Sequence, residues 1–460
     1  MTNTIAKSRE HTAFVVEETT KGTLVYPTAA AEMLILTEQA SLTQKANFTD
    51  SKEINDTLDT LDRFRDQMMA GQFTLDFYLR PSGSAGTAPM GKILFESLMG
   101  TETVTGGTSV VYTQAKTKPS FSVWFKRGHT CYYGSGACAE TLKMDLTNKG
   151  AVECNFGGGF MKKGWAGTDA ANGATAAGTG SGYLVDLVAG YSAGDTVIHV
   201  DTGTGTILEG DVINFEDDAT DYFVADGGGF AGDGDGDITL RAPGLTTSLA
   251  TGKTVTIAGN SKITVDNGKL FTEDALIQIA ADTNTNAGYS IYEVTGNKLY
   301  MKEAVTCADN AVVKGFIPTG LTCVGSPIES LNNSISFDGS AKVLKNMTID
   351  ISSPVEWQNE EITTSGYVED YVESKRAIKV SAGLLFREQD LELFYDALND
   401  TKIAIIATMD GGAGSICAVS MPYVEFDEPD ESPGENTVSL NISGVALGSS
   451  GEDSCSISFT

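Results

Sequence analysis

Apolar and polar residues alternate strictly in several short stretches of this chain, which is the pattern of a β-strand with one buried face. In residues 73–80 (FTLDFYLR), Phe and Leu occupy one face, and Thr, Asp, Tyr and Arg occupy the other. A continuous apolar run at 403–408 is typical of a strand buried on both faces. The alternation returns in four apolar triplets: Phe121, Val123 and Phe125; Met347, Ile349 and Ile351; Val438, Leu440 and Ile442; and Cys455, Ile457 and Phe459. These stretches predict a mainly β protein.

Two short stretches have helical spacing instead. In residues 89–100, Leu94 and Leu98 stand one turn apart, and Gly100 occupies the position of a C-terminal helix cap. Residues 387–400 carry an apolar stripe at helical spacing, formed by Leu391, Phe394, Tyr395 and Leu398. The predicted fold is therefore a β-sandwich or barrel flanked by one or two short helices.

Composition supports this fold class and limits the possible partners. Glycine contributes 51 of 460 residues, as expected for many short strands joined by tight turns. The 61 acidic residues outnumber the 31 Lys and Arg and give a net charge of −30. Proteins bind nucleic acid mainly by neutralising phosphates with Lys and Arg, so a general phosphate-binding surface is excluded. The acidic surface either keeps a large assembly soluble or repels DNA.

The cysteines and the N-terminus indicate the compartment. The cysteines are odd in number and include no CxxC pair, which argues against a disulfide framework and a structural zinc site. They are Cys131, Cys138, Cys154, Cys307, Cys323, Cys417 and Cys455. The N-terminal residues lack the apolar core of a signal peptide, and no run of ~18 apolar residues occurs. We expect a soluble protein that folds in a cytoplasm and does not interact with a membrane.

A change of composition divides the chain. Residues 166–182 consist of small, flexible residues and predict a linker. The region that follows is acidic, and residues 166–262 contain 14 Asp or Glu against three Lys or Arg. Similar strand patterns predict two small β-barrel-like modules, at 183–260 and 261–317, although chance similarity between glycine-rich segments is an alternative. The modules would interrupt one β-rich domain formed by residues 1–165 and 325–460.

No catalytic constellation is evident in the sequence. The three histidines, His11, His129 and His199, are not paired with a Ser or Cys in a nucleophile motif, and no HExxH is present. His129 with Cys131 and Cys138 is better explained as a loop histidine near a buried thiol than as a metal cluster. The acidic run at 425–435 predicts an exposed loop, because acid–base catalysis needs carboxylates in different environments. We expect a protein that is not an enzyme.

The best candidate for a ligand site is the stretch at 226–237 (DGGGFAGDGDGD). Its residues Asp233, Asp235 and Asp237 alternate with glycine, and this spacing can bring carboxylate oxygens around Ca²⁺. An EF-hand does not fit, because no Glu stands at the twelfth position and no flanking helices are expected. A solvated hairpin tip is the alternative, and no other cofactor is predicted.

The N-terminal end contains Glu18-Thr19 with Gly22-Thr23, Ser51 with Glu53-Ile54, the strand from Gly71 to Leu79, and Leu98 to Gly100. In the order of such motifs, both ends of the chain resemble the tail tube proteins (major tail proteins) of bacteriophages. Asn55-Asp56 replace basic residues that often follow this segment in the family, and basic residues resume at Arg63 and Arg65. At the C-terminal end, KVLKNMTIDISSPVEWQNE, IKVSAGLLF, the helix, the apolar strand and MPYVEFDEP occur in family order.

This resemblance implies a structural virion protein. Six subunits would form a ring whose inner sheets join into a β-barrel, and rings would stack around a tape-measure protein, bounded by tail terminator and baseplate or tip proteins. An acidic lumen would let double-stranded DNA pass without specific binding. The segment 41–72 would contact neighbouring subunits, with Ser51, Glu53, Ile54, Arg63 and Arg65 as contact candidates. The inserted modules would be displayed on the outside of the tube, and assembly would take place in the host cytoplasm.

Two other functions remain open at this level. The chain could be another virion β-protein, such as a capsid decoration or adhesion subunit, whose acidic modules bind host glycans or Ca²⁺. A secreted carbohydrate-active enzyme is the third possibility. It is opposed by the lack of a signal peptide and of a convincing pair of carboxylates.

Overall fold

The structure is a computed structural model that describes residues 10–28, 32–53, 59–128, 130–169, 178–227, 234–280, 288–308, 311–316, 321–363, 365–434 and 436–460. The predicted mainly β class is confirmed, since 50% of the chain is in strands and 6% in helices. The chain forms two compact units. Within the described residues, unit 1 comprises 130–131 and 164–316, and unit 2 comprises 10–128, 132–163 and 321–460.

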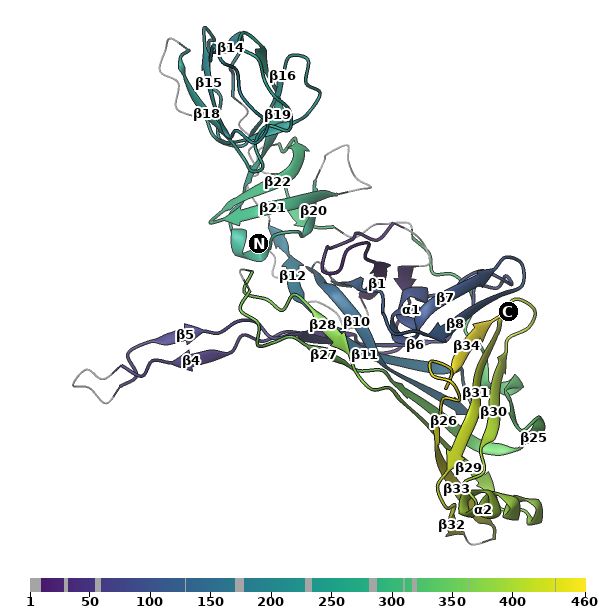
Figure 1. The fold of residues 1–460 in the computed structure, drawn as a ribbon. Helices are drawn as coiled ribbons and strands as arrows, with labels where there is room; N and C mark the ends of the chain where they lie inside the picture. The colour runs from purple at the N-terminus through teal and green to yellow at the C-terminus, as the bar shows by residue number, and fades with distance from the viewer. Residues whose placement is uncertain are drawn as a thin grey trace. The chain divides into compact units, whose positions relative to one another are not determined.

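Unit 2 is built from strands on both sides of the interrupting segment (Figure 1). Those before it are β1 (His11–Glu17), β2 (Met33–Leu34), β3 (Ser41–Thr43), β4 (Phe48–Asp50), β5 (Arg63–Arg65), β6 (Gly71–Tyr78), β7 (Gly100–Thr105), β8 (Ser109–Gln114), β9 (Phe121–Arg127), β10 (Thr130–Thr147), β11 (Glu153–Phe160) and β12 (Lys162–Ala166). Those after it are β24 (Ser334–Phe337), β25 (Ser340–Lys342), β26 (Leu344–Ser352), β27 (Val355–Trp357), β28 (Tyr371–Glu373), β29 (Ala377–Leu385), β30 (Ile403–Asp410), β31 (Ile416–Phe426), β32 (Asp430–Pro433), β33 (Val438–Ala446) and β34 (Ser456–Phe459).

Antiparallel pairing joins early and late strands into two groups. The first group runs in the order β3, β6, β11, β10, β26, β29, β33 and β32. The second runs in the order β25, β24, β30, β31, β34, β8 and β7. The two groups meet where β31 also pairs with β33. Strands far apart in the sequence are neighbours, because β10 pairs with β26 and β8 pairs with β34.

The predicted first helix is confirmed as α1 (Lys92–Met99) and ends at Gly100, which has the left-handed conformation (φ 111°) that glycine adopts without strain. Its Phe95 is fully buried, with ring centroids 5.2 Å from Phe156 of β11 and 5.4 Å from Phe459 of β34. One residue of the helix therefore packs against both strand groups and lies in the core between them.

The predicted second helix is confirmed as α2 (Leu391–Leu398), which follows the 3-10 helix η4 (Glu388–Asp390); a further 3-10 helix, η3, spans Ser330–Asn332. The buried residue of α2 is Leu393, whereas Leu398 of the predicted apolar stripe is 75% exposed and Tyr395 is 67% exposed. Phe394 of the same stripe packs on the core of the unit, so only part of the predicted stripe is covered.

Unit 1 contains a closed β-barrel of six strands, and its strands from β14 to β23 belong to one sheet that also includes β13. The barrel consists of β14 (Tyr183–Val185), β15 (Val197–Asp201), β18 (Gly236–Leu240), β17 (Tyr222–Asp226), β16 (Asp211–Phe215) and β19 (Thr254–Thr264), each antiparallel to the next. The other elements are β13 (Thr168–Asp169), η2 (Gly268–Leu270), β20 (Leu276–Ile279), β21 (Tyr289–Thr295), β22 (Lys298–Val305) and β23 (Val313–Gly315).

Strand β19 connects the barrel of unit 1 to the remaining strands of that unit. Its first half closes the barrel against β14 and β16, and its second half pairs with β22. The predicted boundary between two modules, at 260/261, falls inside this strand. In the predicted linker, residues 168–169 form β13, which pairs with β23.

Candidate functional site

The predicted contact segment contains an exposed hairpin of unit 2. Strands β4 and β5 pair only with each other among the described residues, and Figure 1 shows them extending beyond the sheets of that unit. The side chains of Phe48 and Phe64 are about half exposed. The Arg63 guanidinium lies over the Phe48 ring at 4.9 Å and 3.2 Å from a carboxylate oxygen of Asp50. The hairpin therefore presents aromatic and charged groups to solvent.

Four of the five predicted contact residues lie in the described part of this hairpin. Arg63 and Arg65 are on β5 and are exposed, while Ser51 and Glu53 follow β4. The Ser51 backbone N–H donates to the Asp62 carbonyl at 2.9 Å, so the two strands stay paired beyond β4. Ile54 lies outside the described residues.

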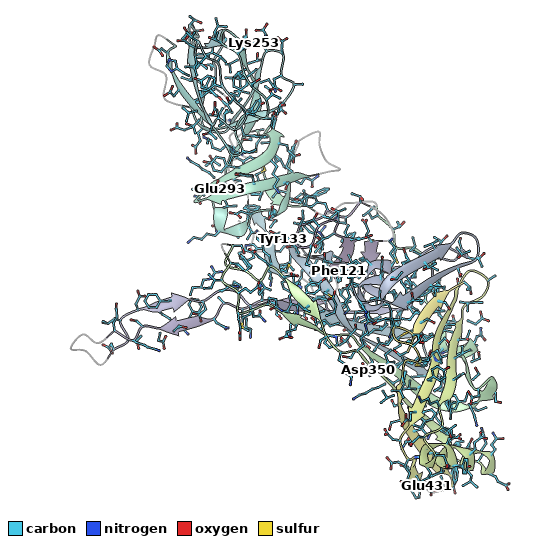
Figure 2. All side chains as sticks on the ribbon, viewed as in Figure 1. Phe121, Tyr133, Lys253, Glu293, Asp350 and Glu431 are labelled. Atoms are coloured by element: carbon cyan, nitrogen blue, oxygen red, sulfur yellow. The ribbon has the colours of Figure 1, made fainter. Side chains whose placement is uncertain are left out.

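A second feature of unit 2 is the polar outer face of its first strand group. One cross-strand row reads Asp76, Asn155, Lys143, Asp350, Lys379 and Val445, and the next reads Tyr78, Glu153, Asp145, Thr348, Ser381 and Ser443. These two rows contain four carboxylates and two lysines. Figure 2 shows Asp350 on β26. The residues between these positions, such as Leu75, Met144 and Ile349, are buried in the core.

Hydrogen bonds within the rows hold this face in place. The Asn155 amide donates to Asp76 at 2.9 Å, and the Thr348 hydroxyl donates to Asp145 at 2.6 Å. Lys143 pairs with Asp145 at 2.8 Å. The four carboxylates outnumber the two lysines, one of which is paired with Asp145, so this face carries excess negative charge and little cationic surface for binding an anion.

The helix α2 adds an apolar surface to unit 2. Leu391, Tyr395 and Leu398 are each more than half exposed, and they lie on one stripe of the helix. Lys342 anchors the start of the helix through Glu392 at 2.5 Å. A grouped exposed apolar stripe of this kind is typical of a protein–protein contact.

The N-terminal motif around Glu18 has a structural role. The Glu18 carboxylate is 6% exposed and accepts hydrogen bonds from the backbone N–H groups of Gly22 and Gly136 and from the hydroxyls of Ser120 and Ser122, each at 2.8 Å. Gly22 and Gly136 both have positive φ angles, 78° and 65°, which explains glycine at these positions. The carboxylate thus ties the end of β1 to β9 and β10.

The predicted metal candidates surround a histidine. In unit 1, Asp237 lies 2.7 Å from Nδ1 of His199, and Asp235 lies 2.9 Å from Nε2. Asp233 lies outside the described residues. Within the described ranges, no group of three or more His, Cys, Asp or Glu side chains is arranged to hold a metal ion. The arrangement binds an imidazolium, because both ring nitrogens face carboxylates.

The pKa values of His199 and His11 should be shifted in opposite directions. The hydrogen bond to Asp237, with the charges of Asp235 and Asp186, raises the pKa of His199 above 6.5, whereas burial and the charge of Arg127 lower the pKa of His11. The stabilisation by the protonated His199 is complete below pH 6.5 and is lost as pH rises through its folded pKa. Imidazole NMR titration, with His199→Gln to assign the signal, checks this; equal midpoints for the two residues would contradict it.

Comparison with known proteins adds no functional assignment. No protein-family model matches the chain, and a search of curated proteins found no significant match. Among the described residues, no helix has the length and apolar character needed to span a lipid bilayer.

Proposed function

We propose that the chain is a structural subunit of a phage tail tube, located in the virion and assembled in the host cytoplasm. The observation that carries the proposal is the polar, acid-rich face spread over six strands of unit 2, backed by a continuous apolar core. A sheet with one face packed and one face polar and repulsive to phosphate suits the wall of a conduit for DNA. The motif order at both ends of the chain supports the same function.

In this proposal the polar face lines the lumen. DNA passes without sticking, because binding requires Lys or Arg to displace the counterions of the phosphates. The two rows contain only two lysines, one of them paired with Asp145. A tape-measure protein occupies the same lumen before the DNA enters, and terminator and tip proteins close the ends of the tube.

Two exposed surfaces of unit 2 are the proposed contacts between copies of the chain. The hairpin of β4 and β5 reaches a neighbouring ring, where Phe48, Phe64 and Arg63 supply the aromatic and Arg anchors that dominate protein interfaces. The exposed stripe of α2 packs against the next subunit in a ring. Six copies form a ring, and unit 1 is displayed on the outside of the tube.

Electron microscopy of the purified full chain tests this proposal. We expect six-fold rings or tubes with a central channel in negative stain. A variant without residues 183–317 should form the same tubes, because unit 2 carries both proposed contact surfaces. Monodisperse monomers at high concentration, even after seeding with tail fragments, would contradict the tube proposal. Loss of rings in the deletion variant, with unit 2 still folded, would show that unit 1 takes part in assembly.

A further inference from the structure

Unit 1 contains a pocket beside its barrel that none of the assembly features uses. The pocket holds about 210 Å³ and lies between the ends of β17 and β18 and the strands β21 and β22. Phe223, Arg241 and Tyr292 line it, and the Tyr292 side chain is 41% exposed. Drug-sized ligands occupy pockets of about 300–1,000 Å³, so this volume suits a single sugar ring or a molecule of similar size. Figure 2 shows the neighbouring residue Glu293 on β21.

Arg241 is the chemically unusual residue of the pocket. Its guanidinium donates to the Met301 carbonyl at 3.1 Å and to the Ser261 hydroxyl at 3.0 Å. An arginine has five N–H donors, so three of them have no partner among the described residues. No carboxylate oxygen of those residues lies within ion-pair distance of this guanidinium, although unit 1 is rich in acids. A half-buried cation without an anionic partner favours binding of an anion.

Aromatic rings frame this cation. The Arg241 guanidinium carbon lies 5.4 Å from the ring centres of Phe223 and Tyr292 and 4.7 Å from that of Tyr300. These contacts hold the planar guanidinium in one orientation. Tyr300 is itself fixed by a hydrogen bond to Glu209, which also pairs with Lys298 at 2.8 Å and Lys262 at 3.3 Å. The binding group is therefore preorganised, which reduces the side-chain entropy that the protein loses when a ligand binds.

The lining also offers hydroxyl groups, beside Lys302, whose ammonium group pairs with Asp274 at 2.8 Å. The hydroxyls of Thr220 and Thr246 are 3.4 Å apart, and the Tyr222 hydroxyl lies 2.9 Å from that of Thr246. The exposed carboxylate of Asp221 accepts one hydrogen bond, from the Asn214 amide at 2.7 Å, and retains further acceptor capacity. A carboxylate beside the pocket disfavours a doubly charged phosphate, but it accepts hydrogen bonds from hydroxyls.

We propose that this pocket binds the carboxylate-bearing sugar of an acidic polysaccharide, a uronic acid residue. Its carboxylate pairs with the free N–H groups of Arg241, and the apolar face of its ring packs on the exposed ring of Tyr292. Its hydroxyls bond to Thr220, Thr246 and Asp221. The ligand thus combines one negative charge, a ring and several hydroxyls, and each part has a counterpart among the residues of the pocket. The inference does not depend on tube formation.

Saturation-transfer NMR with the full chain tests the assignment using three probes: methyl β-D-glucuronide, methyl β-D-glucoside and acetate. We expect the glucuronide to bind with a Kd on the order of 1 mM, because one ring fills the site. The neutral glucoside should bind about 10–100-fold more weakly, since hydrogen bonds to a charged group are lost. Acetate, which lacks the ring, should also bind at least about 10-fold more weakly than the glucuronide.

Matched variants locate the site. Tyr292→Ala should weaken glucuronide binding about tenfold, the worth of one aromatic contact. Tyr423→Ala removes a similarly exposed tyrosine (38% against 41%) from unit 2 and should leave binding unchanged. Arg241→Lys keeps the positive charge but loses the planar pair of N–H donors that matches a carboxylate. It should remove the preference for glucuronide over glucoside, and circular dichroism verifies that the variant folds.

Equal binding of glucuronide and glucoside to the unmodified chain, absence of binding, or binding unaffected by Tyr292→Ala would overturn the proposal. Whether tubes form is a separate measurement, so the two proposals can fail independently.

Discussion

Replacing Glu18 by alanine should lower the free energy of unfolding of unit 2 by about 3–5 kcal/mol, because it leaves buried donors without an acceptor. The carboxylate accepts four hydrogen bonds, from two backbone N–H groups and two serine hydroxyls. The serine hydroxyls can rotate toward other acceptors, but the N–H groups of Gly22 and Gly136 cannot. Denaturant unfolding followed by intrinsic fluorescence measures the loss.

Two further variants separate this role from a general effect of charge. Glu17 is the exposed neighbour of Glu18, and Glu17→Ala should change stability by no more than about 0.5 kcal/mol. The loss of stability in Glu18→Gln should lie between those in Glu17→Ala and Glu18→Ala. The NH₂ group of the glutamine must face one of the backbone N–H donors, whereas its oxygen can still accept from another. Burial raises the pKa of Glu18, so its contribution is largest below the unfolded pKa and decreases as pH rises through the folded one. A loss below about 1 kcal/mol for Glu18→Ala would refute the role of the carboxylate in joining the strands.

Phe48→Asp combined with Phe64→Asp should abolish tube formation while leaving the monomer folded. Both side chains are about half exposed on a hairpin that pairs with no other strand of the described residues, so the folded monomer loses little. At an interface, an aromatic anchor contributes at least about 2 kcal/mol, and the same contact would recur six times between rings. Sedimentation and negative-stain microscopy measure the polymer, and circular dichroism checks the fold.

Val188→Asp is the matched control for this experiment. Val188 is 93% exposed in unit 1, so the change adds a negative charge, half of that in the double variant, to an exposed apolar position outside the hairpin. Tubes should form normally with this variant. Normal tubes with the double hairpin variant would show that the hairpin makes no contact that polymerisation needs.

Local patterns predicted the elements whose environment is set within the subunit. Alternation from Phe73 to Leu79 corresponds to strand β6, where Phe73, Leu75 and Phe77 are buried, as a sheet with one packed face requires. The helix at 92–99 follows from its spacing and from the glycine that ends it. The six-stranded barrel agrees with the β-barrel-like character predicted for the acidic region.

Features that depend on pairing or on solvent were not predictable. The stripe of Leu391, Tyr395 and Leu398 has the spacing of a core face, but spacing does not distinguish a face covered within the subunit from one left to a partner. The apolar run at 403–408 predicted burial on both faces, yet Ile406 is exposed. The acidic run contains a strand, β32, because its backbone pairs with β33, and no composition signal reports such a partner.

In the candidate sites, too, local patterns predicted single residues, but the partners of those residues depend on strand pairing. Asp235 and Asp237 were identified as acidic neighbours, but their partner His199 lies on another strand and could be found only from the register of β15 and β18. The rows of the polar face likewise join Asp76 to Lys379 across five strands. The sequence did not predict Arg241 as a site residue, because an arginine in an acidic region is ordinarily paired with a carboxylate.

The pairing of β8 with β34 also determines when a newly synthesised chain can complete the core of unit 2. Gln114 leaves the ribosome about 340 residues before Ser456, so at roughly 5–20 residues per second β8 waits roughly 20–70 s for its partner strand. During that interval Phe95 and Tyr112 lack the Phe459 ring that covers them in the finished core. The core of unit 2 can therefore be completed only after β34 has emerged from the ribosome.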